Sequence, residues 1–375
     1  MVSSLQKRKN LCALASLCES RHGGIGCGYA ALGTALLKPL IIPIFIPHIG
    51  CPHRCIFCDQ EKITAQSAQA IDGDYVRSVV KQAVHSRTFD AGRNPEVAFY
   101  GGTFTGLPAE RMKELLDAVG PYIEDGLIRS IRVSTRPDFI DEDRVSILKA
   151  SHVDTVELGV QSMDDRVLAM ARRGHSAADV IQAVLLLRED GLKVGVQLMP
   201  GLPGDSEETL CATIEAVISL APDMARLYPA LVIAGTGLAR MYEAGTYRPL
   251  TLDEAVNRCA DGTIRLEGSG IPVIRIGLMS SPSLLEPGRI VAGPWHPAFG
   301  FLVRSRIYHQ AIEPDLPARG TAGQIRIVAS AKEVPLLRGH RNMGIQKIEE
   351  KTGAAIIGIT ADDTVPHGRI RIDVI

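Results

Sequence analysis

The stretch Cys51-Pro-His-Arg-Cys55-Ile-Phe-Cys58 places three cysteines within eight residues. It follows an apolar run, Leu40-Ile-Ile-Pro-Ile-Phe-Ile46, which has the composition of a β-strand. Thiolates are soft metal ligands, so three of them in one loop after a strand indicate a metal site. Three thiolates can hold a cubane iron–sulfur cluster and leave one iron open to another ligand.

Two other chemistries compete for the C-x3-C-x2-C spacing. A structural zinc site needs four ligands, commonly in C-x2-C pairs, and the sequence has no second pair; a fourth ligand from His48 or His53 has no independent support. A secreted disulfide framework needs a higher cysteine density than eight in 375 residues. The other cysteines are scattered and are read as incidental or buried thiols: Cys12, Cys18, Cys27, Cys211 and Cys259. We therefore favour the iron–sulfur site.

Downstream of the cysteines, apolar strands alternate with amphipathic helices. Strands are predicted over 40–46, 95–100, 128–135, 155–161, 193–199 and 224–232. This alternation predicts a parallel α/β fold, specifically a partial (β/α)6 TIM-like barrel. In such barrels the chemistry collects in the loops after the carboxyl ends of the strands. The cysteine loop, Gly101-Gly102-Thr103 and Gly201-Leu-Pro-Gly204 all fall there.

The remaining chain divides into three further segments. Residues 1–38 are predicted to be a poorly structured extension, because the short apolar run after Lys7-Arg-Lys9 lacks a clean signal-peptide cleavage site. The barrel is assigned to 39–235, a barrel-completing and linking segment to 236–322, and a small α/β domain to 323–375. No apolar run is long enough to cross a bilayer, so we expect a cytoplasmic protein with no membrane partner. The oligomeric state is not readable.

At its cysteines and glycines the sequence resembles the radical S-adenosylmethionine (SAM) superfamily. The resemblance implies that Cys51, Cys55 and Cys58 bind a [4Fe–4S] cluster whose fourth iron is chelated by SAM. It also implies reductive cleavage of SAM to a 5′-deoxyadenosyl radical, which abstracts a substrate hydrogen, and an electron donor such as flavodoxin or ferredoxin.

The same resemblance implies a set of SAM contacts. Phe57 would lie beside the adenine, and Gly101, Gly102 and Thr103 would meet the amino group. The remaining positions expected to face SAM are Ser134, Gln161, Arg173 and Gln197. An arginine there can pair bidentately with the SAM carboxylate, although the adjacent Arg172 could take the same role. Alternatively, each of these four side chains has no role in SAM binding and is only a hydrogen-bonded polar residue or a solvated charge.

Within the superfamily, the motifs over roughly residues 40–280 resemble the radical SAM domain of the Elongator catalytic subunit. They include Phe99-Tyr-Gly-Gly-Thr-Phe104, Ser134-Thr-Arg-Pro-Asp138 and Glu157-Leu-Gly-Val-Gln-Ser162. This implies tRNA as the substrate. The sequence after the barrel is expected to be too short for that subunit's acetyltransferase domain. Two alternatives stay open: tetrapyrrole chemistry, as in coproporphyrinogen oxidases, and a non-catalytic RNA-binding or zinc-stabilised scaffold.

The last fifty residues predict strand, helix, basic loop, helix, strand and strand, which resembles a KH-type RNA-binding module. The loop that should read GxxG is Gly339-His-Arg-Asn342, without the second glycine. The basic residues around it are Arg338, His340, Arg341 and Lys347, in a chain whose 41 basic and 42 acidic residues otherwise nearly cancel. The alternative is a small cap that closes the open side of the barrel.

Overall fold

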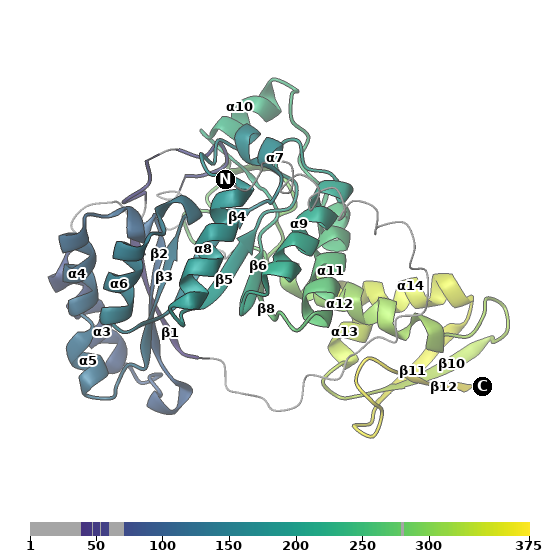
Figure 1. The fold of residues 1–375 in the computed structure, drawn as a ribbon. Helices are drawn as coiled ribbons and strands as arrows, with labels where there is room; N and C mark the ends of the chain where they lie inside the picture. Colours follow the sequence, from purple (N-terminus) through teal and green to yellow (C-terminus); the bar gives the residue numbers. More distant parts are fainter. Residues whose placement is uncertain (1–38, 47, 53, 60–70, 279–280) are drawn as a thin grey trace, which may run out of the picture. The chain divides into compact units, whose positions relative to one another are not determined.

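The computed structural model of the chain describes residues 39–46, 48–52, 54–59, 71–278 and 281–375 (Figure 1). Its main element is a seven-stranded sheet in the order β1-β2-β3-β4-β5-β6-β8, in which every neighbouring pair is parallel. The strands are β1 (Ile41–Ile46), β2 (Glu96–Gly101), β3 (Ser130–Thr135), β4 (Val153–Gln161), β5 (Lys193–Leu198), β6 (Met224–Leu227) and β8 (Val273–Ile276). Because β1 and β8 are the two edges, the barrel is partial, as predicted, with one strand more than the six expected.

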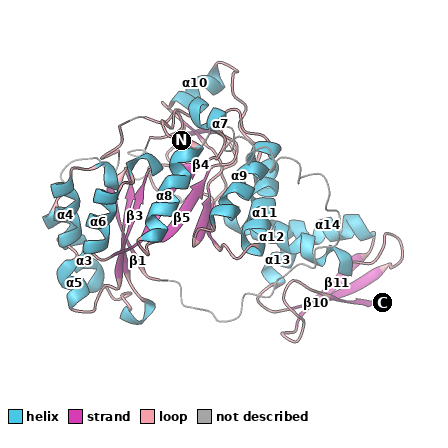
Figure 2. Cartoon of the chain, viewed as in Figure 1, coloured by secondary structure: helices cyan, strands magenta, loops and turns pink. Residues whose placement is uncertain are grey.

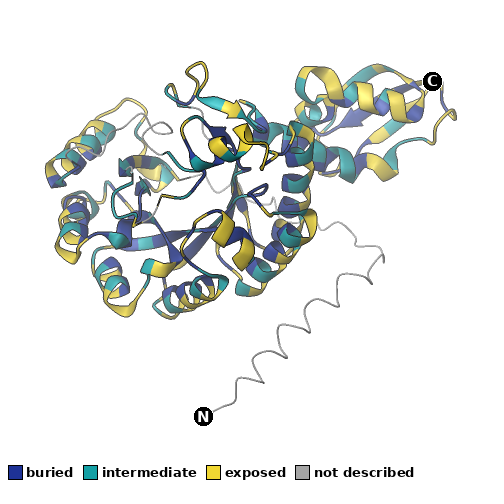
Figure 3. Cartoon of the chain, turned by 90° about the horizontal axis from the view of Figure 1, so that it is seen from above, coloured by how far each residue is buried: buried dark blue, intermediate teal, exposed yellow. Residues whose placement is uncertain are grey.

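Helices connect successive strands and cover one face of the sheet (Figure 2). They include α3 (Gly73–Val84), α4 (Ala109–Asp117), α5 (Gly120–Glu124), α6 (Glu142–Ala150), α8 (Ala177–Glu189), α9 (Glu207–Leu220) and α11 (Leu252–Gly268), whereas α7 (Asp165–Met170) lies at the carboxyl ends of the strands. Capping boxes begin three of them, at Ser176, Ser206 and Thr251. Seen from above, the outer turns of the helices are exposed and the strands between them are buried (Figure 3).

The two faces of the sheet differ in chemistry. The helix-covered face presents fully buried apolar side chains such as Val133, Val156 and Val196. The opposite, concave face carries polar side chains at alternate positions, since side chains alternate along a strand. Arg226 on β6 donates hydrogen bonds both to Glu157 on β4 and to Tyr100 on β2, which only the concave side allows. The interior of the barrel is therefore polar.

The sixth predicted strand, 224–232, is interrupted in the structure. β6 ends at Leu227, and Val232 lies in β7 (Val232–Ile233), which pairs antiparallel with β9 (Ile290–Ala292). The break coincides with Pro229, which has no N–H to donate to the ladder. Residues 288–301, although rich in Gly and Pro, contain β9 and the start of α12 (Phe299–Ile312), which begins just after Pro297.

The C-terminal residues form a second, three-stranded sheet in the order β11-β10-β12. β10 (Gln324–Ala329) is parallel to β11 (Ala355–Ala361) and antiparallel to β12 (Arg371–Val374). Two helices, α13 (Val334–Arg338) and α14 (Met343–Thr352), separate β10 from β11 along the chain, which is the predicted order. The core of this unit also includes Tyr308 and Ile312 of α12.

The prediction for residues 1–38 lies outside the described residues, and the division at 236–322 and 323–375 stays a prediction. In the described parts of the chain, no helix has both the length and the apolar character that a membrane span requires.

Candidate active site at the carboxyl ends of the strands

The first half of the cysteine loop is pressed against the glycine turn after β2. Gly102 N–H donates to Ile46 O at 2.9 Å, and Thr103 N–H donates to Ile49 O at 2.9 Å. A Cβ on Gly102 would lie 2.2 Å from Ile49 O, and one on Gly50 would lie 2.2 Å from Thr103 O. Both positions therefore exclude any side chain. The predicted Gly101-Gly102-Thr103 turn thus holds the cysteine loop, whatever else it contacts.

The second half of the loop is held at Ile56. Its N–H donates to Ala171 O at 3.2 Å, just after α7, and its carbonyl accepts from Leu238 N–H at 2.7 Å, in α10 (Gly237–Glu243). Ile56 and Phe57 are buried in an apolar cluster with Val167, and Cys55 and Cys58 pack against that cluster. Two segments far apart in sequence thereby fix the loop between them.

The three cysteines lie half-buried at this end of the barrel. Cys51 Sγ is 3.2 Å from Thr103 Oγ1, and Arg173 Nη1 donates to Cys55 Sγ at 3.0 Å. Burial raises the pKa of the Cys51 and Cys58 thiols, so metal binding must displace their protons. Within the described residues, no three His, Cys, Asp or Glu side chains form a site for a single ion. A [4Fe–4S] cluster takes each thiolate on a different iron, and a set of three soft donors fits it.

Arg173 is the inward-pointing member of the arginine pair. Its side chain is buried, and Nη2 donates to Gly159 O at 2.6 Å on β4. Its Nε is buried and has no hydrogen-bond partner within the described residues. Arg172 is exposed and has φ of +52°, and this turn is what sends the two side chains in different directions. One donor of Arg173 is thus still available inside the site.

Gln161, Gln197 and Ser134 gather on the same concave face. Gln161 ends β4 with φ of +67°, and Gln197 Nε2 on β5 lies 3.5 Å from Gln161 Oε1. A Cβ on Gly159 would lie 3.0 Å from Gln161 Nε2 and 3.1 Å from Arg173 Nη2, so this glycine makes room for both. Ser134 is half-buried on β3, in register with Glu157. The structure thus brings the predicted polar residues together, while their contacts with SAM stay predictions.

A charged network below these residues was missed in the sequence. Arg132 contacts Glu96 at 2.7 Å and Glu157 at 2.8 Å, and Arg226 contacts the same Glu157 oxygen at 2.7 Å. Burial raises the pKa of Tyr100 to about 12, so its hydroxyl stays protonated beside Arg226. The available signal was charge at alternate positions inside apolar strands, as in Ile131-Arg-Val133. The network pairs every buried charge, which is the condition for tolerating charge in an interior.

Comparison with known proteins supports the geometry. The chain matches the Radical SAM superfamily over residues 45–217 and the Radical_SAM C-terminal domain over residues 222–309. It is 32% identical over 222 residues to an uncharacterized protein of Methanocaldococcus jannaschii, covering 57% of this chain and 67% of that one. It is 28% identical over 253 residues to the tRNA uridine(34) acetyltransferase of Methanocaldococcus infernus, covering 58% and 47%.

Among solved structures, the chain resembles the archaeal Methanocaldococcus infernus Elp3 with an N-terminal deletion. The TM-score is 0.55 at 25% identity, over 73% of this chain and 63% of that one. The chain spans about half the length of the tRNA uridine(34) acetyltransferases that it matches. Radical SAM proteins are enzymes that use a [4Fe–4S] cluster and SAM, and the predicted resemblance is therefore confirmed at the level of family and cofactors.

His175, two residues after Arg173, gives the site a testable pH dependence. Its Nε2 lies 3.2 Å from Val160 O, and its Nδ1 has no partner in the described structure. Burial, and then the charge of Arg173, lower the pKa of His175 from 6.5 to about 4. Between these values the unfolded chain takes up a proton that the folded chain does not. The free energy of unfolding therefore falls as the pH falls through this window.

We expect the titration of His175 to lower the free energy of unfolding of the wild type by about 2 kcal/mol when the pH falls from 7 to 4.5. Urea unfolding at both pH values measures this decrease. The decrease should be about 2 kcal/mol smaller in His175→Gln than in wild type. Replacing the exposed His85 by Gln is the matched control, and should leave the acid loss as in wild type. Equal acid losses in wild type and His175→Gln would contradict the prediction.

Proposed function

Because the chain belongs to the radical SAM superfamily, we propose that it cleaves SAM reductively and uses the resulting radical to modify a base in tRNA. The observation that carries the proposal is the contact of Arg173 Nη1 with Cys55 Sγ at 3.0 Å. It joins the cysteine loop to the polar groups at the ends of β4 and β5. The proposed cluster ligand Cys55 and the candidate SAM-binding residues therefore lie within one site.

The cysteines Cys51, Cys55 and Cys58 would hold the [4Fe–4S] cluster, which when bound supplies the electron for cleaving the sulfonium C–S bond. Arg173 would bind the SAM carboxylate through Nε, the buried donor that the described protein leaves unpaired. The same guanidinium donates to Cys55 Sγ at 3.0 Å, so it would link the SAM carboxylate to a proposed cluster ligand.

The rest of SAM would lie along the concave face. The glycine turn at Gly101, Gly102 and Thr103 offers backbone groups to the amino group, and Gln161 with Gln197 offers amides to the ribose and amino acid ends. Ser134 would complete this row from β3. Phe57 is buried in the apolar cluster with Ile56 and Val167, and we propose that it lies beside the adenine.

The Arg132–Glu157–Arg226 network would form the floor of the site. Its charges are neutralised internally, and Arg226 Nε is buried without a partner in the described residues. A floor of paired charges would position the substrate and limit the water that reaches the radical, because its ion pairs join β2, β3, β4 and β6 across the concave face.

Two observations favour RNA as the substrate. First, relatives over the radical SAM region bear the name tRNA uridine(34) acetyltransferase. Second, the α13–α14 loop has backbone geometry that suits a GxxG-type clamp. Asn342, which stands where the second glycine is expected, has φ of +61°. Asparagine is among the few residues that adopt this left-handed conformation readily, so it can replace glycine here.

The surroundings of this loop also suit a nucleic-acid backbone. Arg338, Arg341 and Lys347 are exposed and have no ion-pair partner among the described residues. Parallel β10 and β11, joined through α13 and α14, form the strand–helix–helix–strand core that carries the loop. The cap alternative also has support, because Tyr308 and Ile312 of α12 contribute to the same core.

Replacing Cys55 by Ala should remove nearly all bound iron and abolish 5′-deoxyadenosine formation, because two thiolates cannot hold the cluster. Cys211→Ala is the matched control, since Cys211 is half-buried on α9 and is not part of the loop. Iron and sulfide content after anaerobic reconstitution, and 5′-deoxyadenosine after reduction with dithionite, are the measurements. A Cys55→Ala protein with wild-type iron content would refute the assignment.

A strain that lacks the gene should lose one modified nucleoside from its tRNA. Mass spectrometry of digested total tRNA measures the loss. A plasmid with the wild-type gene should restore the nucleoside, whereas one with the Cys55→Ala gene should not. An unchanged nucleoside profile would rule out tRNA, and accumulation of a tetrapyrrole precursor in that strain would favour the tetrapyrrole alternative.

Asn342→Gly should keep the RNA affinity of the protein, because glycine accepts a positive φ, whereas Asn342→Val should weaken it about tenfold, because a β-branched residue is strained there. Fluorescence anisotropy with labelled tRNA gives the affinities, and circular dichroism shows whether Asn342→Val remains folded. Equal affinities for tRNA in the Gly and Val variants would count against the loop as an RNA contact.

A further inference from the structure

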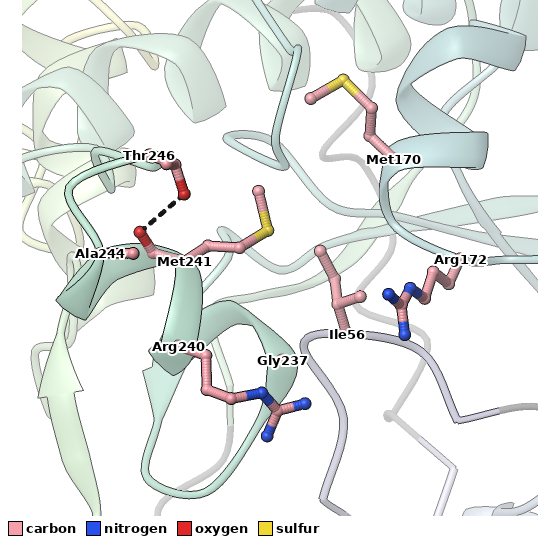
Figure 4. A pocket seen from close by; sticks show the side chains of 8 residues that line it. All are labelled: Ile56, Met170, Arg172, Gly237, Arg240, Met241, Ala244 and Thr246. Atoms are coloured by element: carbon pink, nitrogen blue, oxygen red, sulfur yellow. Dashed lines mark hydrogen bonds between the residues drawn. The ribbon is translucent and has the colours of Figure 1, made fainter.

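A pocket of about 300 Å³ lies beside the cysteine loop, outside the barrel interior (Figure 4). None of the described residues that line it belongs to a strand of the main sheet; they come from the cysteine loop, from α7 and the turn after it, and from α10 and the segment that follows. The lining residues are Ile56, Met170, Arg172, Gly237, Arg240, Met241, Ala244 and Thr246. The pocket is therefore separate from the concave face that would hold SAM.

The pocket reaches the cysteine loop through Ile56. This residue stands between Cys55 and Cys58, and its backbone is bonded to Ala171 and Leu238. Arg172 directly follows the first of these anchors, and Arg240 lies two residues after the second. Figure 4 shows their guanidinium groups on either side of Ile56. A molecule seated here would lie against the outer side of the loop that holds two proposed cluster ligands.

The pocket has positive charge that the described protein does not neutralise. Arg172 and Arg240 are exposed, and neither has a hydrogen-bond or ion-pair partner for its side chain in the described structure. Arg54, on the cysteine loop itself, is likewise exposed and unpaired there. None of the described lining residues is Asp or Glu, in a chain with 41 basic and 42 acidic residues. The surface is complementary to an acidic partner.

The apolar lining favours a protein over a nucleic acid. Met170, 43% exposed, and Met241 provide flexible apolar contacts, and Met and Arg are both enriched at protein interfaces. Single-stranded nucleic acid sites instead use aromatic side chains on which bases stack, and no aromatic residue is among the described lining residues.

From this arrangement we infer that the surface of Arg172, Arg240, Met170 and Met241 is the docking site of an acidic one-electron carrier protein. The inference rests on the proposed function, which requires one electron per SAM cleaved. The carrier loses one electron and the cluster gains it, with no bond made or broken. Such contacts are small and transient, and charged rims set their association rate and salt dependence.

The test compares Arg172→Glu/Arg240→Glu with Lys113→Glu/Arg129→Glu, which changes the charge equally at exposed positions on α4 and just before β3. Calorimetric titration with flavodoxin, and separately with an acidic ferredoxin, gives the affinities. We expect the first variant to bind the carrier about tenfold more weakly and the control to bind like wild type. Wild-type affinity should fall as salt is raised.

A second readout separates this inference from the proposed function. With dithionite as reductant, wild type and both variants should form 5′-deoxyadenosine at rates within about twofold of each other, because a small reductant needs no docking site. No product from wild type would overturn the proposed function and this inference with it. Product from wild type, but equal carrier affinity in wild type and Arg172→Glu/Arg240→Glu, would overturn the docking site alone. The docking site would also be overturned if Arg172→Glu/Arg240→Glu lost affinity for tRNA but kept its affinity for both carriers.

Discussion

The backbone restraint of the cysteine loop is the constraint on which the rest of the site depends. Three thiols can share a cluster only if the fold holds their sulfur atoms close together. Here all three lie in one loop, so that loop must itself be held in place. Here the fixing is done by main-chain contacts: Gly102 against Ile46 and Ile49 on one side, and Ile56 between Ala171 and Leu238 on the other. The loop is thereby tied to β2, to the turn after α7, and to α10. Each of these segments also carries a residue of the proposed chemistry or of its partner surface.

The turn after α7 shows how one local conformation serves both sides of the loop. The positive φ of Arg172 sends its side chain outward, to the pocket, and allows Arg173 to enter the barrel and reach Cys55. The same turn supplies the carbonyl of Ala171 that holds Ile56. A single strained position therefore links the cluster loop, the candidate carboxylate-binding arginine and the exposed cation beside the pocket. Backbone strain of this kind persists only where its surroundings enforce it.

The sequence predicted the barrel and the cysteine site because both depend on local patterns: the alternation of apolar strands with helices, and three thiols in one loop. It did not predict the Arg132–Glu157–Arg226 network. The alternation in Ile131-Arg-Val133 marks a polar face, but which charges meet depends on the order and register of the strands. The predicted length of the sixth strand, 224–232, was wrong. The apolar pattern continues past Pro229, but the strand ends before this residue because proline has no N–H to donate. The choice between Arg172 and Arg173 could not be made either, because it depends on one φ angle. Asn342 is a similar case. The sequence shows only that the loop lacks the second glycine of a GxxG motif, whereas the structure shows that Asn342 has the positive φ that glycine would allow.

The polar floor and the outer arginines impose opposite electrostatic conditions on the two sides of the cysteine loop. Inside, every charge of the floor has a counter-charge within hydrogen-bond distance, so the floor itself is nearly neutral. Outside, Arg54, Arg172 and Arg240 carry charge that the described protein leaves open. A floor without net charge suits a radical, which reacts by hydrogen abstraction. Long-range attraction suits a partner that must arrive, deliver one electron and leave. The loop can then serve both events without either partner competing for the other's surface.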